Sequence, residues 1–151
     1  MKTIKIWGVL LAMTFLALSS VSCEKGNDDD SGSLPTNPYF GAYTWTWSDI
    51  FLDGKKYIGY NPAQQGESWY LTLNEDMTFS ESYYGGESAN GTFTWDSNNA
   101  QLIFNYIRGG GFFPGEKLDV KSWTKSKLVV VYDHGQDETG KTAVEHAHLT
   151  K

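Results

Sequence analysis

The most constraining feature of this 151-residue sequence is residues 40–50, FGAYTWTWSDI, in which large rings alternate with small residues. Tyr43, Trp45 and Trp47 occupy every second position, with Ala, Thr and Ser between them. Successive side chains of a β-strand point to opposite faces of the sheet, so this spacing puts the three rings on one face. We therefore predict a half-buried strand whose rings face a core or a lumen.

Short runs of the same kind follow, and turn signals separate them. Asp53-Gly54 is the strongest short-range hairpin signal, and residues 74–77 and 96–99 predict two further turns. Residues 108–115, RGGGFFPG, are expected to form a flexible loop. The predicted strands are residues 40–50, 57–60, 68–74, 78–84, 91–96, 101–107, 117–123, 128–132 and 142–149.

The region from residue 39 to the end has the size and composition of one β domain. It holds 113 residues, 21 of them aromatic, and shows no convincing helical period. Regular hairpin spacing favours pairing between strands that are neighbours in sequence. The predicted fold class is all-β, a small antiparallel up-and-down barrel of eight or nine strands, in which closure removes the exposed edges.

The first 22 residues are typical of an export signal. Lys2 and Lys5 precede an apolar run at 6–18, and small residues fill positions 19–22. Cys23, the only cysteine, follows directly. The sequence SVSC at 20–23 resembles the lipobox of bacterial lipoproteins, which implies lipid attachment at Cys23, cleavage before it, and anchoring in the outer membrane. An ordinary secretory signal followed by an unmodified cysteine is the alternative.

Residues 23–38 are rich in acids, Gly, Ser and Pro, and contain one aliphatic residue. Such a composition cannot bury enough apolar surface to order the chain, so we predict a flexible acidic tether before a barrel domain at 39–151. The acids Glu24 and Asp28 to Asp30 resemble export signals that carry lipoproteins to the cell surface. They are equally consistent with a tether that is merely well solvated.

The charge of the chain argues against polyanionic partners. The sequence has 12 basic and 18 acidic residues, and removal of residues 1–22 takes away two lysines and no acids, which leaves a net charge of −8. Nucleic acids and anionic membrane surfaces require basic patches. We therefore expect no nucleic-acid partner and contact with the membrane through the lipid anchor only.

Several segments of the domain resemble the bacterial lipocalin-like domains found as small lipoproteins. These are Gly41 with YTW at 43–45, LTLNEDMTF at 71–79, GTFTW at 91–95 with QLIF at 101–104, and SKLVVVY at 126–132 before a final strand. The resemblance implies a barrel that carries a small ligand. The sequence departs from classical lipocalins in having Tyr43 where a tryptophan is usual, and in ending without a carboxy-terminal helix.

Strand parity gives a set of side chains expected to face the barrel interior and to contact any ligand. An eight-stranded barrel is wide enough either to be filled by its own side chains or to hold one small ligand, and both remain open. In the first case the chain is a ligand-free structural or interaction module that shows outward aromatics, such as Tyr84 and Trp123, to a protein or glycan partner. In the second it binds a small apolar or amphipathic ligand. The interior candidates are Tyr43, Trp45, Trp47, Trp69, Leu71, Phe79, Phe93, Trp95, Phe104 and Tyr106.

Catalytic and metal-binding patterns are weak. His146 and His148 share a strand face and could chelate zinc with a third ligand, but the sequence identifies none. The acids of residues 133–138 lack the spacing of a calcium loop, and no Gly-x-Ser-x-Gly nucleophile motif occurs. We therefore expect no enzyme activity, no metal and no cofactor.

Overall fold

The computed structural model describes residues 34–83 and 86–151. The expected export signal, Cys23 and the tether up to residue 33 lie outside the described residues, and so does Tyr84. The described part contains one short 3₁₀ helix, Pro62–Gln65, and the strands β1 (Gly41–Leu52), β2 (Lys55–Tyr60), β3 (Trp69–Leu73), β4 (Thr78–Tyr83), β5 (Ser88–Asp96), β6 (Gln101–Arg108), β7 (Gly111–Trp123), β8 (Lys127–Gln136) and β9 (Thr142–Thr150). Across residues 34–83 and 86–151, we find no helix with the length and apolar character needed to cross a bilayer.

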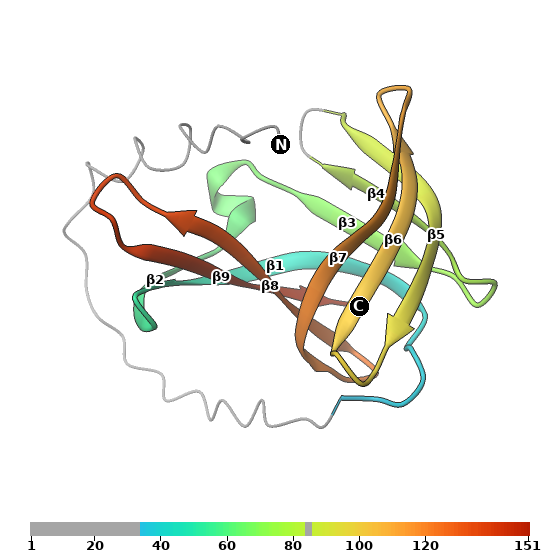
Figure 1. Cartoon of the computed structure of the whole chain (residues 1–151), viewed down its shortest axis with the longest axis horizontal. Helices are drawn as coiled ribbons and strands as arrows, with labels where there is room; N and C mark the ends of the chain where they lie inside the picture. The colour runs from blue at the N-terminus through green and yellow to red at the C-terminus, as the bar shows by residue number, and fades with distance from the viewer. Residues whose placement is uncertain (1–33, 84–85) are drawn as a thin grey trace.

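The strands form the antiparallel up-and-down barrel that the sequence predicts. The sheet order is β2-β1-β3-β4-β5-β6-β7-β8-β9, and β1 also pairs with β9, so eight strands close the barrel (Figure 1). The extra strand is β2, which pairs with the second half of β1 while β3 pairs with residues 41–44 at the start of β1. Pairing therefore departs from sequence order at one place: β3 pairs with β1 and not with β2, which precedes it in the sequence.

The Asp53-Gly54 turn forms as the sequence predicts. Both residues have positive φ, 49° and 75°, which suits the mirror-image turn that matches the twist of a hairpin. The turn is also tied to the far hairpin, because the Asp53 amide donates to the Thr142 carbonyl at 2.9 Å. This contact fixes the β1–β2 hairpin against the start of β9.

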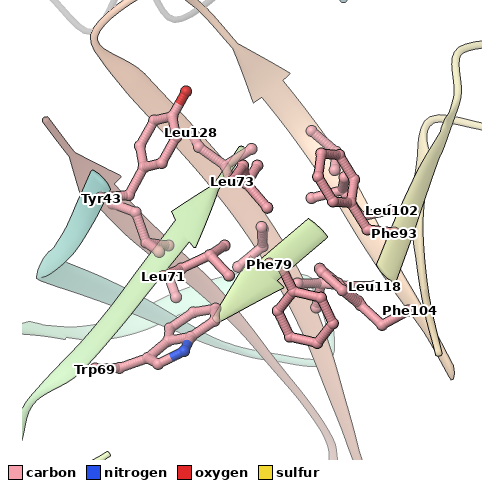
Figure 2. Close-up of a cluster of buried hydrophobic side chains, with 14 of the residues drawn as sticks. Tyr43, Trp69, Leu71, Leu73, Phe79, Phe93, Leu102, Phe104, Leu118 and Leu128 are labelled. Atoms are coloured by element: carbon pink, nitrogen blue, oxygen red, sulfur yellow. The ribbon is translucent and has the colours of Figure 1, made fainter. Parts of the chain in front are cut away.

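One end of the barrel is filled by its own side chains. Leu71, Leu102 and Leu128 have no exposed surface, and they belong to one cluster with the buried aromatic rings (Figure 2). Burial of a large aliphatic side chain contributes roughly 1.5 to 3 kcal/mol, so this cluster supplies much of the stability of a domain without a disulfide. The packed interior that we left open as one alternative is therefore present at this end.

The segment before β1 lies against that filled end. Leu34 and Tyr39 pack against the core cluster, and the Trp95 Nε1 group donates to the Pro35 carbonyl at 2.7 Å. At the other terminus, Lys151 donates to the Phe40 carbonyl at 2.6 Å. Residues 34–38, which composition alone places in the tether, are thus packed against the barrel.

The expected flexible loop at 108–115 is instead a tight hairpin. β6 continues to Arg108 and β7 starts at Gly111, so only Gly109 and Gly110 separate them. Both glycines have positive φ, 57° and 80°, which a two-residue hairpin turn needs. The glycine run predicts a loop because it lacks the alternation of apolar and polar residues that indicates a strand. In the structure, two of these glycines form the turn and the third begins β7. Pro114, inside β7, lies in the half of the strand that has no partner toward β8.

The barrel opens between β7 and β8. These strands pair only where residues 119–123 of β7 meet residues 128–131 of β8. Beyond that point β7 pairs with β6 alone and β8 with β9 alone. The β6–β7 and β8–β9 hairpins consequently run toward different sides of the molecule (Figure 1).

Candidate functional site

A cavity of about 580 Å³ occupies the end of the barrel where β7 and β8 separate. Its wall includes Leu118 of β7 and Val131 and Tyr132 of β8, the residues at the point of divergence. Side chains of β3, β4 and β6 also line the cavity. The other lining residues are Trp69, Phe79, Glu81, Tyr83, Glu87, Phe104, Tyr106, Arg108, Glu116, Lys117, Asp119 and Asp133.

An ion pair spans the inner wall of this cavity. The Arg108 guanidinium contacts a Glu81 oxygen at 2.7 Å, and the Glu81 side chain is largely buried. The second Glu81 oxygen accepts hydrogen bonds from Tyr83 Oη at 2.9 Å and Trp69 Nε1 at 3.3 Å. Burial opposes the charge on Arg108, but the Glu81 carboxylate outweighs it and raises the pKa of Arg108 above its usual value. Both oxygens of this carboxylate are therefore occupied by protein donors.

Aromatic rings enclose the guanidinium. The Arg108 Cζ atom lies 5.3 Å from the ring centre of Tyr83 and 5.3 Å from that of Tyr106, within the range of cation–π attraction. Phe113 stacks on the Tyr106 ring at 5.1 Å. The Tyr106 hydroxyl donates to Glu116, and burial together with this carboxylate raises the pKa of Tyr106 to about 12. Aromatic rings thus surround the Arg108 charge, and carboxylates lie beside it.

Most of the predicted interior side chains lie inside the barrel, but only some reach the cavity. Trp69, Phe79, Phe104 and Tyr106 line it. The others are buried at the filled end or packed half-buried against it: Tyr43, Trp45, Leu71, Phe93 and Trp95. The ligand-binding role of the four cavity residues stays a prediction.

The expected inward placement of Trp47 is wrong. Trp45 pairs with Leu149, and the register then shifts so that Trp47 pairs with His148 on the opposite face. This β-bulge reverses the alternation, and Trp47 is 40% exposed. Its ring covers Gly59, where an added Cβ would lie 2.5 Å from the Trp47 ring.

The expected outward placement of Trp123 is wrong for the same physical reason. Counting by twos from the inward Leu118 and Val120 predicts an outward Trp123, but the register shifts between Val120 and Ser122. Trp123 is consequently 1% exposed. The other named aromatic, Tyr84, lies outside the described residues.

Sequence reasoning missed the charged residues of the cavity. Glu81 lies two positions after Phe79, and Arg108 two positions after Tyr106, so each continues an inward-facing series. Strand parity could therefore have identified both. Glu116 could not have been found this way, because it lies between the expected loop at 108–115 and the expected strand at 117–123, where strand parity is not defined.

A second polar cluster is centred on the buried Glu145. This carboxylate accepts from Ser48 Oγ at 2.5 Å, is paired with His134 Nε2 at 2.9 Å, and lies 3.4 Å from Tyr60 Oη. Burial would raise the pKa of Glu145, but the bonds to His134 and Ser48 hold it below its usual value. The nearby Glu67 has a raised pKa from burial and from the Glu145 charge. The buried Ser48 hydroxyl is bound to a carboxylate, which makes this cluster a structural tie between β1, β8 and β9.

His146 and His148 lie on one face of β9, as their spacing predicts. His148 Nε2 lies 3.2 Å from Asp49 Oδ2, and Lys121 donates to His146 Nδ1 at 3.1 Å. Burial, and then the Lys121 and His148 charges, lower the pKa of His146. Within residues 34–83 and 86–151, no group of three or more His, Cys, Asp or Glu side chains is placed to hold a metal ion.

Comparison with known proteins leaves the family of the chain unassigned. No protein-family model matches the sequence, and no curated protein shows significant similarity to it.

Proposed function

We propose that this protein is a lipid-anchored, lipocalin-like binding protein of the bacterial outer membrane that holds a small amphipathic ligand. The observation that carries this proposal is the cavity between β7 and β8. Its volume of about 580 Å³ falls within the range of about 300 to 1,000 Å³ typical of small-molecule sites. Phe79, Phe104 and Leu118 give it an apolar wall, and the Glu81–Arg108 pair with its tyrosines gives it a polar one. A ligand with both characters fits better than a wholly apolar one.

Binding without catalysis is part of the proposal. Glu81 and Arg108 neutralise each other, and each Glu81 oxygen already has a donor. The tyrosines that line the cavity keep their protons, because burial raises the pKa of Tyr83, Tyr106 and Tyr132. The ion pair and the protonated tyrosines are therefore suited to orienting a ligand by hydrogen bonds, and not to acting as nucleophiles or bases.

The ligand is sought by offering the protein a mixture of cellular molecules and identifying what it retains. The expected mature chain, residues 23–151 with Cys23→Ser, lacks the apolar export signal and cannot be acylated. It is mixed with a bacterial lipid and metabolite extract, separated by gel filtration and analysed by mass spectrometry. We expect a retained small amphiphile. Leu118→Trp puts a bulky ring into the cavity and should abolish retention of the ligand. Ile103 does not line the cavity, so the Ile103→Trp variant should still retain the ligand. Equal retention by both variants would place any bound molecule outside this cavity.

A second function gains support if nothing is retained. Ile107 and Phe112 form a cross-strand pair on the β6–β7 hairpin, and their side chains are 57% and 66% exposed. Phe113 is on the other face of this hairpin, where it stacks on Tyr106. Contiguous exposed apolar side chains are typical of interaction sites. The protein would then be an interaction module that presents this hairpin to a protein or glycan partner.

The anchor is tested separately. Cys23→Ser in the full chain should abolish the uptake of radioactive palmitate that we expect for the wild-type protein in growing cells, because the thiol that would carry the lipid is lost. Ser31→Ala, a control in the same acidic stretch, should leave that uptake unchanged. Protease added to intact cells then reports whether the anchored protein is displayed on the surface. Palmitate label retained by the Cys23→Ser variant would contradict lipid attachment at this residue.

A further inference from the structure

Two hydrogen-bond donors of the cavity wall have no acceptor within the described part of the chain. The Arg108 Nε group is buried and has no partner there. The Tyr132 hydroxyl makes no hydrogen bond with any described residue. Because a buried donor without an acceptor is costly, an acceptor on a ligand would be favoured at Arg108 Nε. The Tyr132 hydroxyl is not among the buried atoms without a partner, so it remains open to a second contact with a ligand.

The Arg108 donor becomes reachable through a small movement. Protein atoms cover Nε, although about a third of the whole side chain is exposed. The guanidinium lies between the rings of Tyr83 and Tyr106, and it can turn between them while it keeps a nitrogen on Glu81. A ligand oxygen that enters beside these rings supplies the missing bond and so favours that turn.

The charges of the cavity oppose an anionic ligand. Of its lining residues, Glu81, Glu87, Glu116, Asp119 and Asp133 are acidic, and only Arg108 and Lys117 are basic. Burial raises the pKa of Tyr132, and the charges of Tyr83, Glu81, Glu145 and Glu116 raise it further. A carboxylate or phosphate would meet this field at short range, where charge repulsion is weakly screened.

The part of the wall around Glu81 offers little to a cationic ligand. The rings best placed for cation–π contact, Tyr83 and Tyr106, already hold the Arg108 guanidinium. Both oxygens of Glu81 are also bound by protein donors. A cation would have to displace a side chain that is paired with a buried carboxylate, which is costly.

We propose that the ligand is an uncharged amphiphile whose polar end carries hydroxyl or ester oxygens. These oxygens accept from Tyr132 Oη and Arg108 Nε, and a hydroxyl can donate in turn to Glu116. The apolar part lies against Phe79, Phe104 and Leu118. This inference rests on the proposed ligand-binding function and specifies the chemical class of the ligand.

The test compares three probes with the same twelve-carbon chain: 1-dodecanoylglycerol, dodecanoate and dodecylammonium. Binding to the expected mature chain, residues 23–151 with Cys23→Ser, is measured by calorimetry below the aggregation limit of each probe. The glycerol ester should bind at least about tenfold more tightly than either charged probe. Dodecanoate or dodecylammonium binding as tightly as the ester would overturn the inference and leave the proposed function standing. Binding of none of the three would count against the proposed function itself.

Two point variants test whether Tyr132 and Glu116 cause the preference for an uncharged ligand. Tyr132→Phe removes one hydroxyl and should weaken binding of the glycerol ester about fivefold, while Tyr70→Phe on the outer surface should not change it. Glu116→Gln removes one negative charge and should strengthen dodecanoate binding, whereas Glu75→Gln, which does not line the cavity, should not. An unchanged affinity of the Tyr132→Phe variant would refute the proposed placement of the polar end.

Discussion

Trp123→Ala is expected to lower the free energy of unfolding by about 4 kcal/mol, because it removes the largest fully buried side chain of the filled end. Its Nε1 group donates to the Tyr43 hydroxyl at 3.0 Å, and its ring meets the edges of Tyr39 and Trp95. The loss therefore combines a large cavity with a hydroxyl deprived of its donor. Chemical denaturation followed by circular dichroism measures it.

Trp47→Ala is the matched control, since it deletes the same side chain from the other face of the barrel. Trp47 covers Gly59 and donates to Asp49 at 2.9 Å, but it is partly solvated, so we expect a loss of about 1 kcal/mol. If Trp123→Ala does not fold, Trp123→Phe, which keeps most of the buried ring area, still gives a measurable loss. Equal losses at positions 47 and 123 would contradict the assignment of the two bulges.

Gly91→Ala is expected to cost about 3 kcal/mol or more, because β5 and β6 approach each other too closely at this residue for a side chain. An added Cβ would lie 2.0 Å from the Asn105 carbonyl oxygen and 2.8 Å from the Tyr106 Cα atom. Both are backbone atoms, so no side-chain rotation relieves the clash. The measurement is again the free energy of unfolding.

Gly54→Ala separates this steric effect from the general cost of replacing glycine. Gly54 has φ of 75° and nothing within 4 Å of an added Cβ, so the substitution should cost only about 1 kcal/mol of backbone strain. Gly91 has no positive φ, and its requirement for glycine is purely one of space. A Gly91→Ala loss no larger than that of Gly54→Ala would mean that β5 and β6 can separate at low cost.

The chemical character of the site depends on residues far apart in the sequence. Glu81 and Arg108 are 27 positions apart, on β4 and β6, and they meet only because both strands face the same lumen. Strand parity indicates that each points inward, but it cannot indicate that they pair. Nor can it indicate that Tyr132 and Glu116 lie on either side of an opening, because that opening exists only where β7 and β8 stop pairing.

The sequence by itself determined the elements and their order. Alternation with period two located the strands, Asp53-Gly54 located a hairpin turn, and short connections made an up-and-down barrel the expected fold. These are local properties, since they depend on the twist and pleat of a few adjacent residues. The same reasoning identified nine side chains that lie inside or against the barrel core.

Only the tertiary structure decided which face Trp47 and Trp123 take, how far the hairpins at residues 101–123 and 127–150 diverge, and where a cavity remains. A β-bulge reverses every side chain beyond it, and whether one forms is set by the register that two distant strands can both satisfy. The position of the cavity likewise depends on where β7 and β8 stop pairing, and the pattern of a single strand does not indicate that point. That is why the fold could be predicted from the sequence while the position and polarity of its candidate site could not.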